Sequence, residues 1–436
     1  MDFSTKAQEI ITTLLAEEIS AHIEAEEINN AEELENGLRE MLKEIGRQTY
    51  GKVLEKEDEK LGKRIECACG SKAKRISKRS AKVMTVFGWI EYWRSYYGCA
   101  RCGKKESRLD EDWGLWPGEV SQVLGKLLAI AGVDIAFERA RRTIQGMLLL
   151  EVSDNSIRKQ TQDEGVRQAE NEAEWIRESH DERWLQKRER RMGKVPDRLY
   201  GSIDGAHVPI ETEWRELKTV CWYEVAGVYG QEKHKAQEIS YHSEIAPAKD
   251  FGQLVWASGV RRMADKAGEL IFVCDGAAWI WRLVEQYFPN AVQIVDWYHA
   301  CEYLTPIAEA VFSQETERQA WLQKVKDWLW EGEIENVIQA CQLCISHRLA
   351  ADAVQKAVTY FTNNGHRMKY AEYREKGYWI GSGTVESACK QIASARLKIA
   401  GARWTLQGAI ATAKARAAWL SDGDGFNTLC SLPLAA

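Results

Sequence analysis

Hydrophobic residues recur at helical spacing in the first 60 residues and then give way to the alternation typical of strands. The helical positions near the amino terminus are Ile10, Leu14, Leu15 and Ile19. Residues 83–94 alternate on either side of Gly88, which predicts a β-hairpin with its turn at that glycine. The helical pattern returns between Glu119 and Gly165 and continues through a densely charged stretch over residues 166–196.

Beyond the charged stretch the pattern changes to short apolar runs separated by turns. Three strand-like runs lie between residues 198 and 245, and a helical stretch covers Phe251 to Ala267. A buried strand ending in Asp275, a helix over residues 278–288 and a buried strand within 291–300 follow. Three strands in a meander, then strand–helix–strand, is the layout of a ribonuclease-H-like domain with a mixed sheet flanked by helices.

The predicted fold class is therefore a multidomain α+β protein with a ribonuclease-H-like catalytic core. The segment after this strand–helix–strand unit is helical with little strand signal and is interpreted as an insertion into the core. The expected segments are a helical N-terminal module (1–60), a zinc-ribbon-like hairpin (61–110), a helix-turn-helix region (111–168), a charged helical linker (169–197), the first part of the core (198–300), the helical insertion (301–376), the final helices of the core (377–420) and a tail (421–436).

The composition is that of a soluble globular protein. Of 436 residues, 45% are hydrophobic and 28% are charged, which excludes a disordered chain, a collagen-like chain and a small disulfide scaffold. No apolar stretch approaches the roughly 18 uninterrupted residues of a membrane-spanning helix. The amino terminus also lacks the basic and apolar regions of a signal peptide. We therefore expect a cytoplasmic protein with reduced thiols and no membrane partner.

Charge is distributed unevenly along a chain whose net charge is -6. Residues 1–60 carry 16 acidic and 7 basic side chains, whereas residues 61–105 carry 12 basic and 2 acidic ones. Residues 390–416 carry six basic side chains and no acidic one. Basic blocks on an acidic chain can guide a polyanion to particular surfaces, although solvated faces are the plainer interpretation.

Two pairs of cysteines bracket the predicted hairpin, and they are candidate metal ligands. Cys67 and Cys69 precede it, and Cys99 and Cys102 follow it. Four thiolates held together by a hairpin are typical of a structural zinc site in a module with little core. Cys67-Ala-Cys69 is one residue shorter than the usual C-x-x-C spacing, so four reduced thiols without metal remain the alternative.

A helix, a short turn at Glu151-Val152 and a second helix capped by Ser153 resemble a helix-turn-helix. In such motifs the second helix enters the major groove of DNA, so Asn155, Arg158 and Lys159 would face the bases and phosphates. A three-helix pack that binds no DNA is the alternative.

Three acidic residues stand where a catalytic metal site would need them. Asp204 lies mid-strand among small and apolar residues, Asp275 ends a buried strand, and Glu386 opens a helix after a glycine-rich loop. In a ribonuclease-H-like sheet the first and fourth strands are neighbours, so the two aspartates would converge. A helix across that edge would supply the glutamate. Two Mg²⁺ (or Mn²⁺) ions about 4 Å apart at these carboxylates could activate a water or a 3′-hydroxyl against a phosphodiester.

Several motifs, taken in order, are similar to those of one known family. They are CACG, CARCG with RSYYGC, LDEDWGL, IAFERA, SIDGAHVPIETEWRELK, CDGAAWIWRLVEQYFPNA, VDWYHACEYL, WLWEGEIENVI, GSGTVESACKQI and GARWTLQGA. Over about residues 65–420 the chain resembles the DDE transposases of bacterial insertion sequences, specifically the Kra-type (Kra-four) family, which is related to Mutator-like transposases. The resemblance implies that Asp204, Asp275 and Glu386 form the metal-binding triad.

The same resemblance points to further residues. Asp296-Trp-Tyr-His299 looks like the D-x-x-H motif of Mutator-like relatives, which would put His299 near the scissile phosphate. A histidine at the core edge that caps a helix is the alternative. Glu211, Glu213 and Glu216 are also family-like, and their role stays open.

Two residues beside the final acidic helix are candidate DNA contacts on chemical grounds. Arg403 could contact the DNA backbone, and Trp404 could stack on a base. Trp404 could equally belong to the core.

These observations predict a DNA transposase that binds terminal inverted repeats, hydrolyses phosphodiesters and joins the freed 3′-hydroxyls to target DNA. The expected partners are double-stranded DNA and further copies of the chain in a homodimer or higher oligomer, with the protein on the nucleoid when bound. The rival functions are a transposase-derived DNA-binding regulator without cleavage activity and a nuclease that cuts without strand transfer.

Overall fold

The computed structural model describes residues 30–191, 195–227 and 235–422, together with Thr13, Glu17 and Ser20. The predicted helical positions Ile10, Leu14, Leu15 and Ile19 lie outside the described residues, as does the tail beyond residue 422. The chain divides into two compact units. One comprises Met1–Leu127 and Arg142–Val152, and the other comprises Leu128–Arg141 and Ser153–Ala436.

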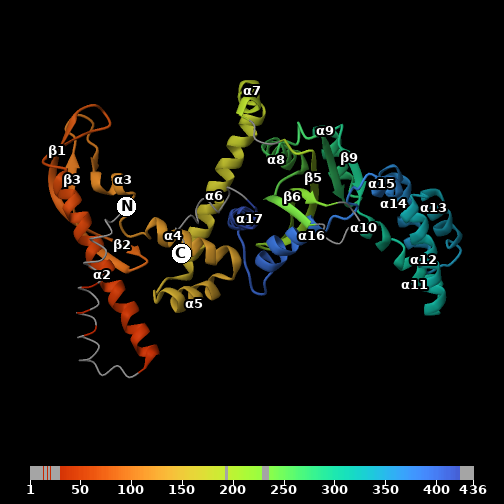
Figure 1. Cartoon of the computed structure of the whole chain (residues 1–436), viewed down its shortest axis with the longest axis horizontal. Coiled ribbons are helices and arrows are strands. Elements are labelled where there is room, and N and C mark those ends of the chain that lie inside the picture. Colours follow the sequence, from red (N-terminus) through yellow and green to blue (C-terminus); the bar gives the residue numbers. More distant parts are fainter. Residues whose placement is uncertain are drawn as a thin grey trace. The chain divides into compact units, whose positions relative to one another are not determined.

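The first unit contains a four-stranded antiparallel sheet, in which the strands follow one another in chain order (Figure 1). The predicted hairpin is confirmed, with its turn at Gly88, but its strands are longer than the alternation indicated. The elements are α2 (Ala31–Lys60), β1 (Arg64–Glu66), β2 (Lys72–Thr85), β3 (Gly88–Gly98), β4 (Lys105–Glu106) and α3 (Arg108–Trp113).

Helix α2 is fastened to this sheet by a buried carboxylate. Asp58 is fully buried and accepts hydrogen bonds of 2.7 Å from both the backbone N–H and the hydroxyl of Ser95 on β3. Leu54, one turn earlier, packs with Val83 and Ile90 of the hairpin. Because a buried carboxylate is costly unless it is hydrogen-bonded, Asp58 fixes how α2 lies on the sheet.

Four helices follow, namely α4 (Gln122–Asp134), α5 (Phe137–Leu148), α6 (Asp154–Ser179) and α7 (Glu182–Arg191). The predicted cap is confirmed, since the Ser153 hydroxyl accepts a 3.0 Å bond from the N–H of Ser156. Helix α6 then runs well past the expected boundary at residue 168. The helix continues through Gly165. A glycine is needed at this position because a Cβ there would collide with the backbone of Ala411 at 1.8 Å.

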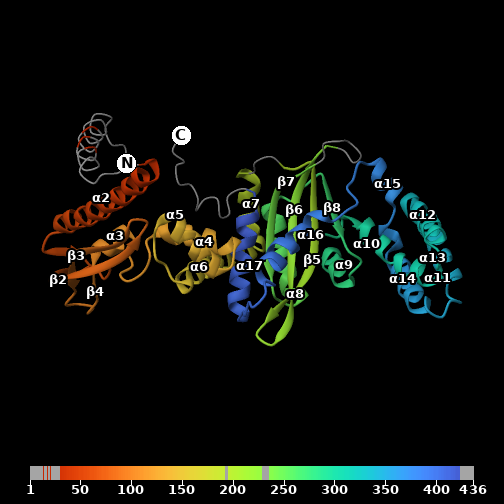
Figure 2. The same cartoon turned by 90° about the horizontal axis from the view of Figure 1, so that it is seen from below.

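The second unit contains a mixed five-stranded sheet in the order β7-β6-β5-β8-β9 (Figure 2). The first three strands form an antiparallel meander, and β8 and β9 run parallel to β5. This confirms the predicted strand sequence and the α+β class. The strands are β5 (Arg198–Ile210), β6 (Glu213–Ala226), β7 (Lys235–Glu244), β8 (Glu269–Cys274) and β9 (Val292–Val295).

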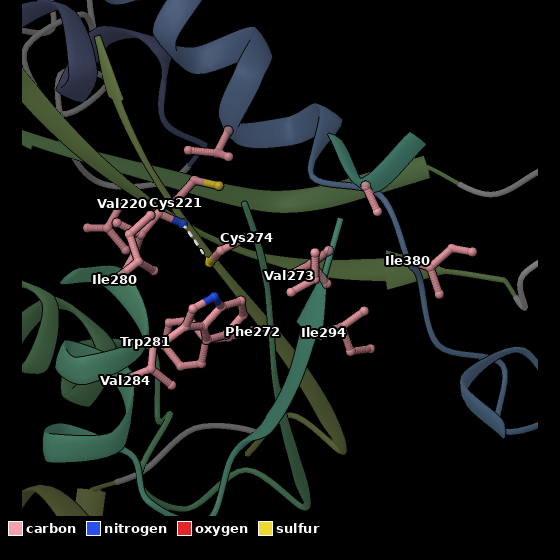
Figure 3. Packing of buried hydrophobic residues seen from close by; sticks show 14 of the residues in the cluster. Val220, Cys221, Phe272, Val273, Cys274, Ile280, Trp281, Val284, Ile294 and Ile380 are labelled. Atoms are coloured by element: carbon pink, nitrogen blue, oxygen red, sulfur yellow. Dashed lines mark hydrogen bonds between the residues drawn. The ribbon is translucent and has the colours of Figure 1, made fainter. Parts of the chain in front are cut away.

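Helices α8 (Ala248–Arg261) and α9 (Ala278–Tyr287) cover the apolar side of this sheet. Figure 3 shows Ile280, Trp281 and Val284 of α9 beside Phe272 and Cys274 of β8. These side chains are 4% exposed or less. The sheet that carries the candidate acids therefore rests on a dry core.

Over its described length, the segment after β9 consists of helices joined by turns and contains no strand, as predicted, and Figures 1 and 2 show its helices packed side by side. The Tyr370 hydroxyl anchors it by donating to the carbonyl of Val295 at 3.0 Å. Its elements are α10 (Trp297–Glu302), α11 (Thr305–Val311), α12 (Glu315–Glu331), α13 (Ile334–Leu343), α14 (Ala351–Asn364), a 3₁₀ turn (Gly365–Arg367) and α15 (Tyr370–Glu375).

The chain then returns to the sheet through α16 (Gly383–Cys389), a π-helical segment (Lys390–Leu397) and α17 (Leu406–Leu420). Helix α16 packs against β5 and β6, and α17 packs against α6 and β7. Among the described ranges of the chain, no helix is both long and apolar enough to cross a membrane.

Candidate active site and cysteine cluster

The pairing of β5 with β8 brings two of the predicted acids to the same level of the sheet. Gly201 pairs with Phe272, and the same register continued by three residues sets Asp204 opposite Asp275. The backbone N–H of Ile203 donates to the Cys274 sulfur at 3.3 Å, so the strands are still adjacent at that level (Figure 3). The two aspartates differ by 71 in residue number, which is the same difference as between paired residues of β5 and β8.

The environment of Asp275 is poor for a negative charge. Burial is the largest cause that raises the pKa of its carboxyl, and the charges of Asp204 and Glu216 raise it further. The N–H of Ala277, which donates to the carboxylate at 2.9 Å, and the nearby His299 act in the opposite direction. Like charges gathered at a partly buried sheet edge favour a cation as their partner.

Glu216 belongs to this acidic group, and sequence reasoning had left its role open. It sits on β6 opposite His207, and its side chain lies over Gly205, where a Cβ would meet the Glu216 Oε1 at 2.3 Å. Lys218 Nζ lies 2.7 Å from the other carboxylate oxygen. The glycine after Asp204 is thus what admits a neighbouring glutamate to the site.

The other two glutamates of that segment are exposed. Glu213 lies 3.3 Å from Arg215, and the backbone N–H of Glu211 donates to the carbonyl of Trp404 at 2.9 Å.

Asp296 holds the loop that leads to Glu386. It is fully buried, and its Oδ1 accepts a 2.8 Å bond from the His299 N–H at the start of α10. Its Oδ2 accepts from the N–H of Ser382, and the neighbouring Trp297 N–H donates to the carbonyl of Ile380 at 2.9 Å. One carboxylate therefore caps α10 and clamps the turn before α16.

His299 stands between the acids with its side chain about one-third exposed. Its Nε2 is 3.6 Å from the Glu386 Oε1 and its Nδ1 is 3.4 Å from the Glu302 Oε2. Burial opposes protonation of the imidazole, but the surrounding carboxylates outweigh it and raise the pKa of His299 above 6.5. These carboxylates are Asp296, Glu302, Glu386 and Asp275. In the cap of α10, His299 takes part only through its backbone N–H, which donates to Asp296. Its ring faces Glu302 and Glu386.

A pocket of about 430 Å³ opens beside Asp275 and His299 and is closed on its far side by the helical segment. Tyr360 of α14 stacks on Tyr303 with ring centroids 3.8 Å apart, and its ring lies against Gly276, where a Cβ would meet it at 2.1 Å. The Tyr360 residue is 8% exposed, and its hydroxyl has no hydrogen-bond partner among the described residues. Tyr303 falls within the motif VDWYHACEYL, which assigned it no role, and Tyr360 falls in none of the motifs.

Asp204, Asp275 and Glu386 offer the oxygen ligands that Mg²⁺ prefers, so the donor chemistry fits. Among the residues that it describes, however, the structure does not bring these three acids together as a group that could hold one metal ion. Within the described residues, the group of three or more potential ligands that converge this closely is the cysteine cluster.

The four cysteines meet as predicted. Cys67 and Cys102 sulfurs are 3.5 Å apart, Cys69 and Cys99 sulfurs are 3.6 Å apart, and all four lie within 4.8 Å of one another. Sulfurs on one tetrahedral zinc at about 2.3 Å would stand about 3.8 Å apart. The backbone N–H groups of Cys102 and Arg101 lower the pKa of Cys99 to about 6, which favours the thiolate that metals bind. Without a metal, the neighbouring thiols and burial raise the pKa of Cys67 to about 12 and also raise that of Cys69. This cluster could bind a metal such as zinc.

The candidate DNA contacts differ in exposure. Asn155, Arg158 and Lys159 are exposed in the first turns of α6, and Lys159 lies 3.1 Å from Asp163. Arg403 is exposed. Trp404 is 6% exposed and donates its indole N–H to the carbonyl of Leu397 at 3.0 Å, which supports the core role left open for it rather than base stacking.

Comparison with known proteins connects the chain to one group. No curated protein matches it. Residues 24–428 match the uncharacterised protein family UPF0236, which covers both units described above. The chain therefore belongs to the uncharacterised protein family UPF0236.

Proposed function

We propose that this protein is a DDE-type DNA transposase of an insertion sequence, as its resemblance to the Kra-type family implies. It would bind terminal inverted repeats, cut the DNA at their ends and join the 3′-hydroxyls to a target. The single observation that carries the proposal is the β5–β8 register, which sets Asp204 opposite Asp275 next to the His299–Glu386 pair.

The sheet supports a ribonuclease-H-like core as part of the proposal. Its order β7-β6-β5-β8-β9, with an antiparallel meander followed by two parallel strands, is the arrangement expected of that fold. Helix α16 packs on β5 and β6, so Glu386 approaches the same edge from above the strands. The helices between β9 and α16 would be an insertion that walls the site.

The proposed cofactor is a pair of Mg²⁺ or Mn²⁺ ions held by Asp204, Asp275 and Glu386. Bound there, such cations would supply positive charge against the developing charge of the reacting phosphate. Glu216 adds to the negative field that attracts them.

The other side chains would position these ligands and the DNA. Asp296 holds the turn before Glu386, and a protonated His299 would donate toward the Glu386 carboxylate and fix its direction. Tyr360, whose hydroxyl is buried, would form part of the wall of the adjacent pocket. Each of these contacts depends on the helical insertion or on its return to the sheet.

DNA binding is assigned to other parts of the chain. The proposed helix-turn-helix would use the exposed Asn155, Arg158 and Lys159, with the sequence-specific contacts made from the start of α6. Zinc held by the four cysteines would be structural and would stabilise the strongly basic hairpin (residues 61–105) for contact with phosphates.

Cleavage of an inverted-repeat duplex by the purified full-length chain in Mg²⁺ tests this function. The terminal repeats are read from the DNA that flanks the gene. Asp204→Asn, Asp275→Asn and Glu386→Gln keep size and shape but remove a charge, so each should bind the duplex normally and lose cleavage by at least about a thousandfold. Glu213→Gln is the matched control, because it removes an exposed carboxylate of the same sheet.

The other outcomes identify the rivals. A parent protein that binds the repeat and never cuts it is a regulator, and one that cuts without joining is a nuclease. If Glu386→Gln cuts as well as the parent while Glu216→Gln does not, then Glu216 rather than Glu386 is the third acid.

A further inference from the structure

A second pocket has three arginines among the residues that line it. Its volume is about 360 Å³, and it lies between the start of α5, the first half of α6 and the loop that follows the π-helical segment. Arg158 and Gln162 line it from α6, Arg396 from the π-helical segment and Arg403 from the loop. Glu138 also lines it, so three arginines share the pocket with one carboxylate.

Arg396 is the unusual member of this group. It is 1% exposed, and its guanidinium lies against two rings that contact each other, 4.4 Å from the centre of Phe137 and 5.2 Å from that of Trp404. Its Nε donates to the carbonyl of Gly132 at 2.9 Å. Within the part of the chain that the structure describes, its Nη2 has no hydrogen-bond partner and no ion pair holds its charge.

The buried charge persists at neutral pH. Burial, and then the charge of Arg416, lower the pKa of Arg396 to about 10, with Asp134 acting in the opposite direction. A buried cation with an unsatisfied N–H is costly unless an anion or acceptor completes it. The planar guanidinium fork matches the oxygens of a phosphate.

The local backbone gives an independent reason to expect a ligand. Residues 390–397 form a π-helix, a rare conformation that occurs frequently at functional sites. Arg396 lies in this segment and lines the pocket.

We propose that this pocket binds a phosphate group, with Arg396 at its base and Arg158 and Arg403 at its rim. The ligand is a backbone phosphate of DNA, and only that choice of source rests on the proposed function. Inorganic phosphate is the other source of the same chemistry. The pocket would bind the DNA backbone at a point outside the acidic site. This second contact would fix the direction in which the duplex leaves the acidic site.

Isothermal titration of the full-length chain with inorganic phosphate tests the site itself. Phosphate should bind, and Arg403→Ala and Arg158→Ala should each weaken it about tenfold, since each removes one charge-assisted hydrogen bond. Arg396→Lys keeps the charge and loses the fork, so it should weaken binding while the protein stays folded. Arg177→Ala, an exposed arginine further along α6, is the matched control and should change nothing.

Duplex DNA provides the second arm. If the pocket takes a backbone phosphate, phosphate should compete with DNA, and Arg403→Ala should weaken DNA binding while Arg177→Ala does not. Phosphate binding without any effect on DNA would overturn DNA as the source. No phosphate binding by the parent, or equal binding by all four variants, would overturn the site. Asp204→Asn should bind phosphate normally, so failure of the catalytic proposal is read separately.

Discussion

At the scale of single residues, the candidate active site depends on glycines, whose lack of a side chain leaves room for neighbouring side chains. Gly205 admits the Glu216 carboxylate, and Gly276 admits the ring of Tyr360. Asp296 holds the start of α10 and the turn before α16 in place, because its two carboxylate oxygens accept hydrogen bonds from backbone N–H groups of these segments. The two glycines could be read in the sequence as Asp-Gly pairs, but the side chains that fill the space beside them could not.

Gly276 offers a test of this packing that is independent of function. A Cβ there would stand 2.1 Å from the Tyr360 ring, so Gly276→Ala should force the ring aside and reduce the free energy of unfolding by about 1–3 kcal/mol. Urea denaturation measures this, and Gly383→Ala, which would meet nothing within 4 Å, is the control. Equal effects of the two substitutions would show that the ring does not pack as described.

Sequence reasoning found Asp204, Asp275, His299 and Glu386 because each stands at a recognisable strand end, motif or helix start. It assigned no role to Tyr303 or Tyr360, because their stacking joins the end of α10 to α14, which lies far along the chain. It also missed Arg396 as a pocket residue. Nothing in the sequence shows that a basic residue within a helical segment is buried.

At the scale of elements, α17 is tied to α6 and β7 by a buried ionic network. Lys414 is 4% exposed and contacts Glu172 of α6 and, at 2.8 Å, Glu244 of β7. His242 lies 2.9 Å from the other oxygen of Glu172. The periodicity of the sequence predicted these helices. It could not predict their mutual contact, which joins residues 242 positions apart.

Replacing Lys414 should show what this network contributes. Lys414→Met leaves the buried Glu172 with only His242 beside it and removes the lysine from the partly exposed Glu244, so the free energy of unfolding should fall by about 3–5 kcal/mol. Thermal or urea denaturation measures it, and Lys249→Met, at an exposed lysine of α8, should change it by less than about 0.5 kcal/mol. A loss as small as that of the control would mean that the pair is not buried.

The same network predicts a dependence of stability on pH. Burial raises the pKa of Glu172, but Lys414 and His242 outweigh it and hold that pKa below its ordinary value of 4.5. A lowered carboxyl pKa stabilises the fold fully above pH 4.5, and the contribution is lost as pH falls through the lowered value. The stability difference between the parent and Glu172→Gln should therefore shrink below pH 4.5. A difference that grows on acidification would contradict this sign.

The cysteine cluster is the second element-scale feature with a direct test. The purified chain should hold about one zinc bound mainly through sulfur, and Cys99→Ser should lose it and loosen the hairpin to proteolysis. Cys344→Ser, at a buried cysteine outside the cluster, should keep the zinc. Metal content unchanged in Cys99→Ser would end the four-cysteine proposal.

At the scale of the whole molecule, two compact units divide the work proposed for the protein. The cysteine cluster and the basic hairpin lie in the first, and the mixed sheet, the acidic site and the phosphate pocket lie in the second. The alternation and periodicity of the sequence predicted the strands and helices of both. Two of the three crossings between the units fall within α4 and α5, where the helical pattern gives no sign of a boundary, and the third falls between Val152 and Ser153, at the predicted turn.

The most direct test of the central claim is strand transfer. The full-length chain is mixed with Mg²⁺, a supercoiled target and a labelled inverted-repeat duplex that ends in a free 3′-hydroxyl, and the joined product is sequenced. The account predicts joined product from the parent and from Glu213→Gln, and a loss of at least about a thousandfold for Asp204→Asn, although that variant still binds the duplex. Joining by Asp204→Asn at the parent's rate, or no joining by a parent that binds the repeat, would contradict it.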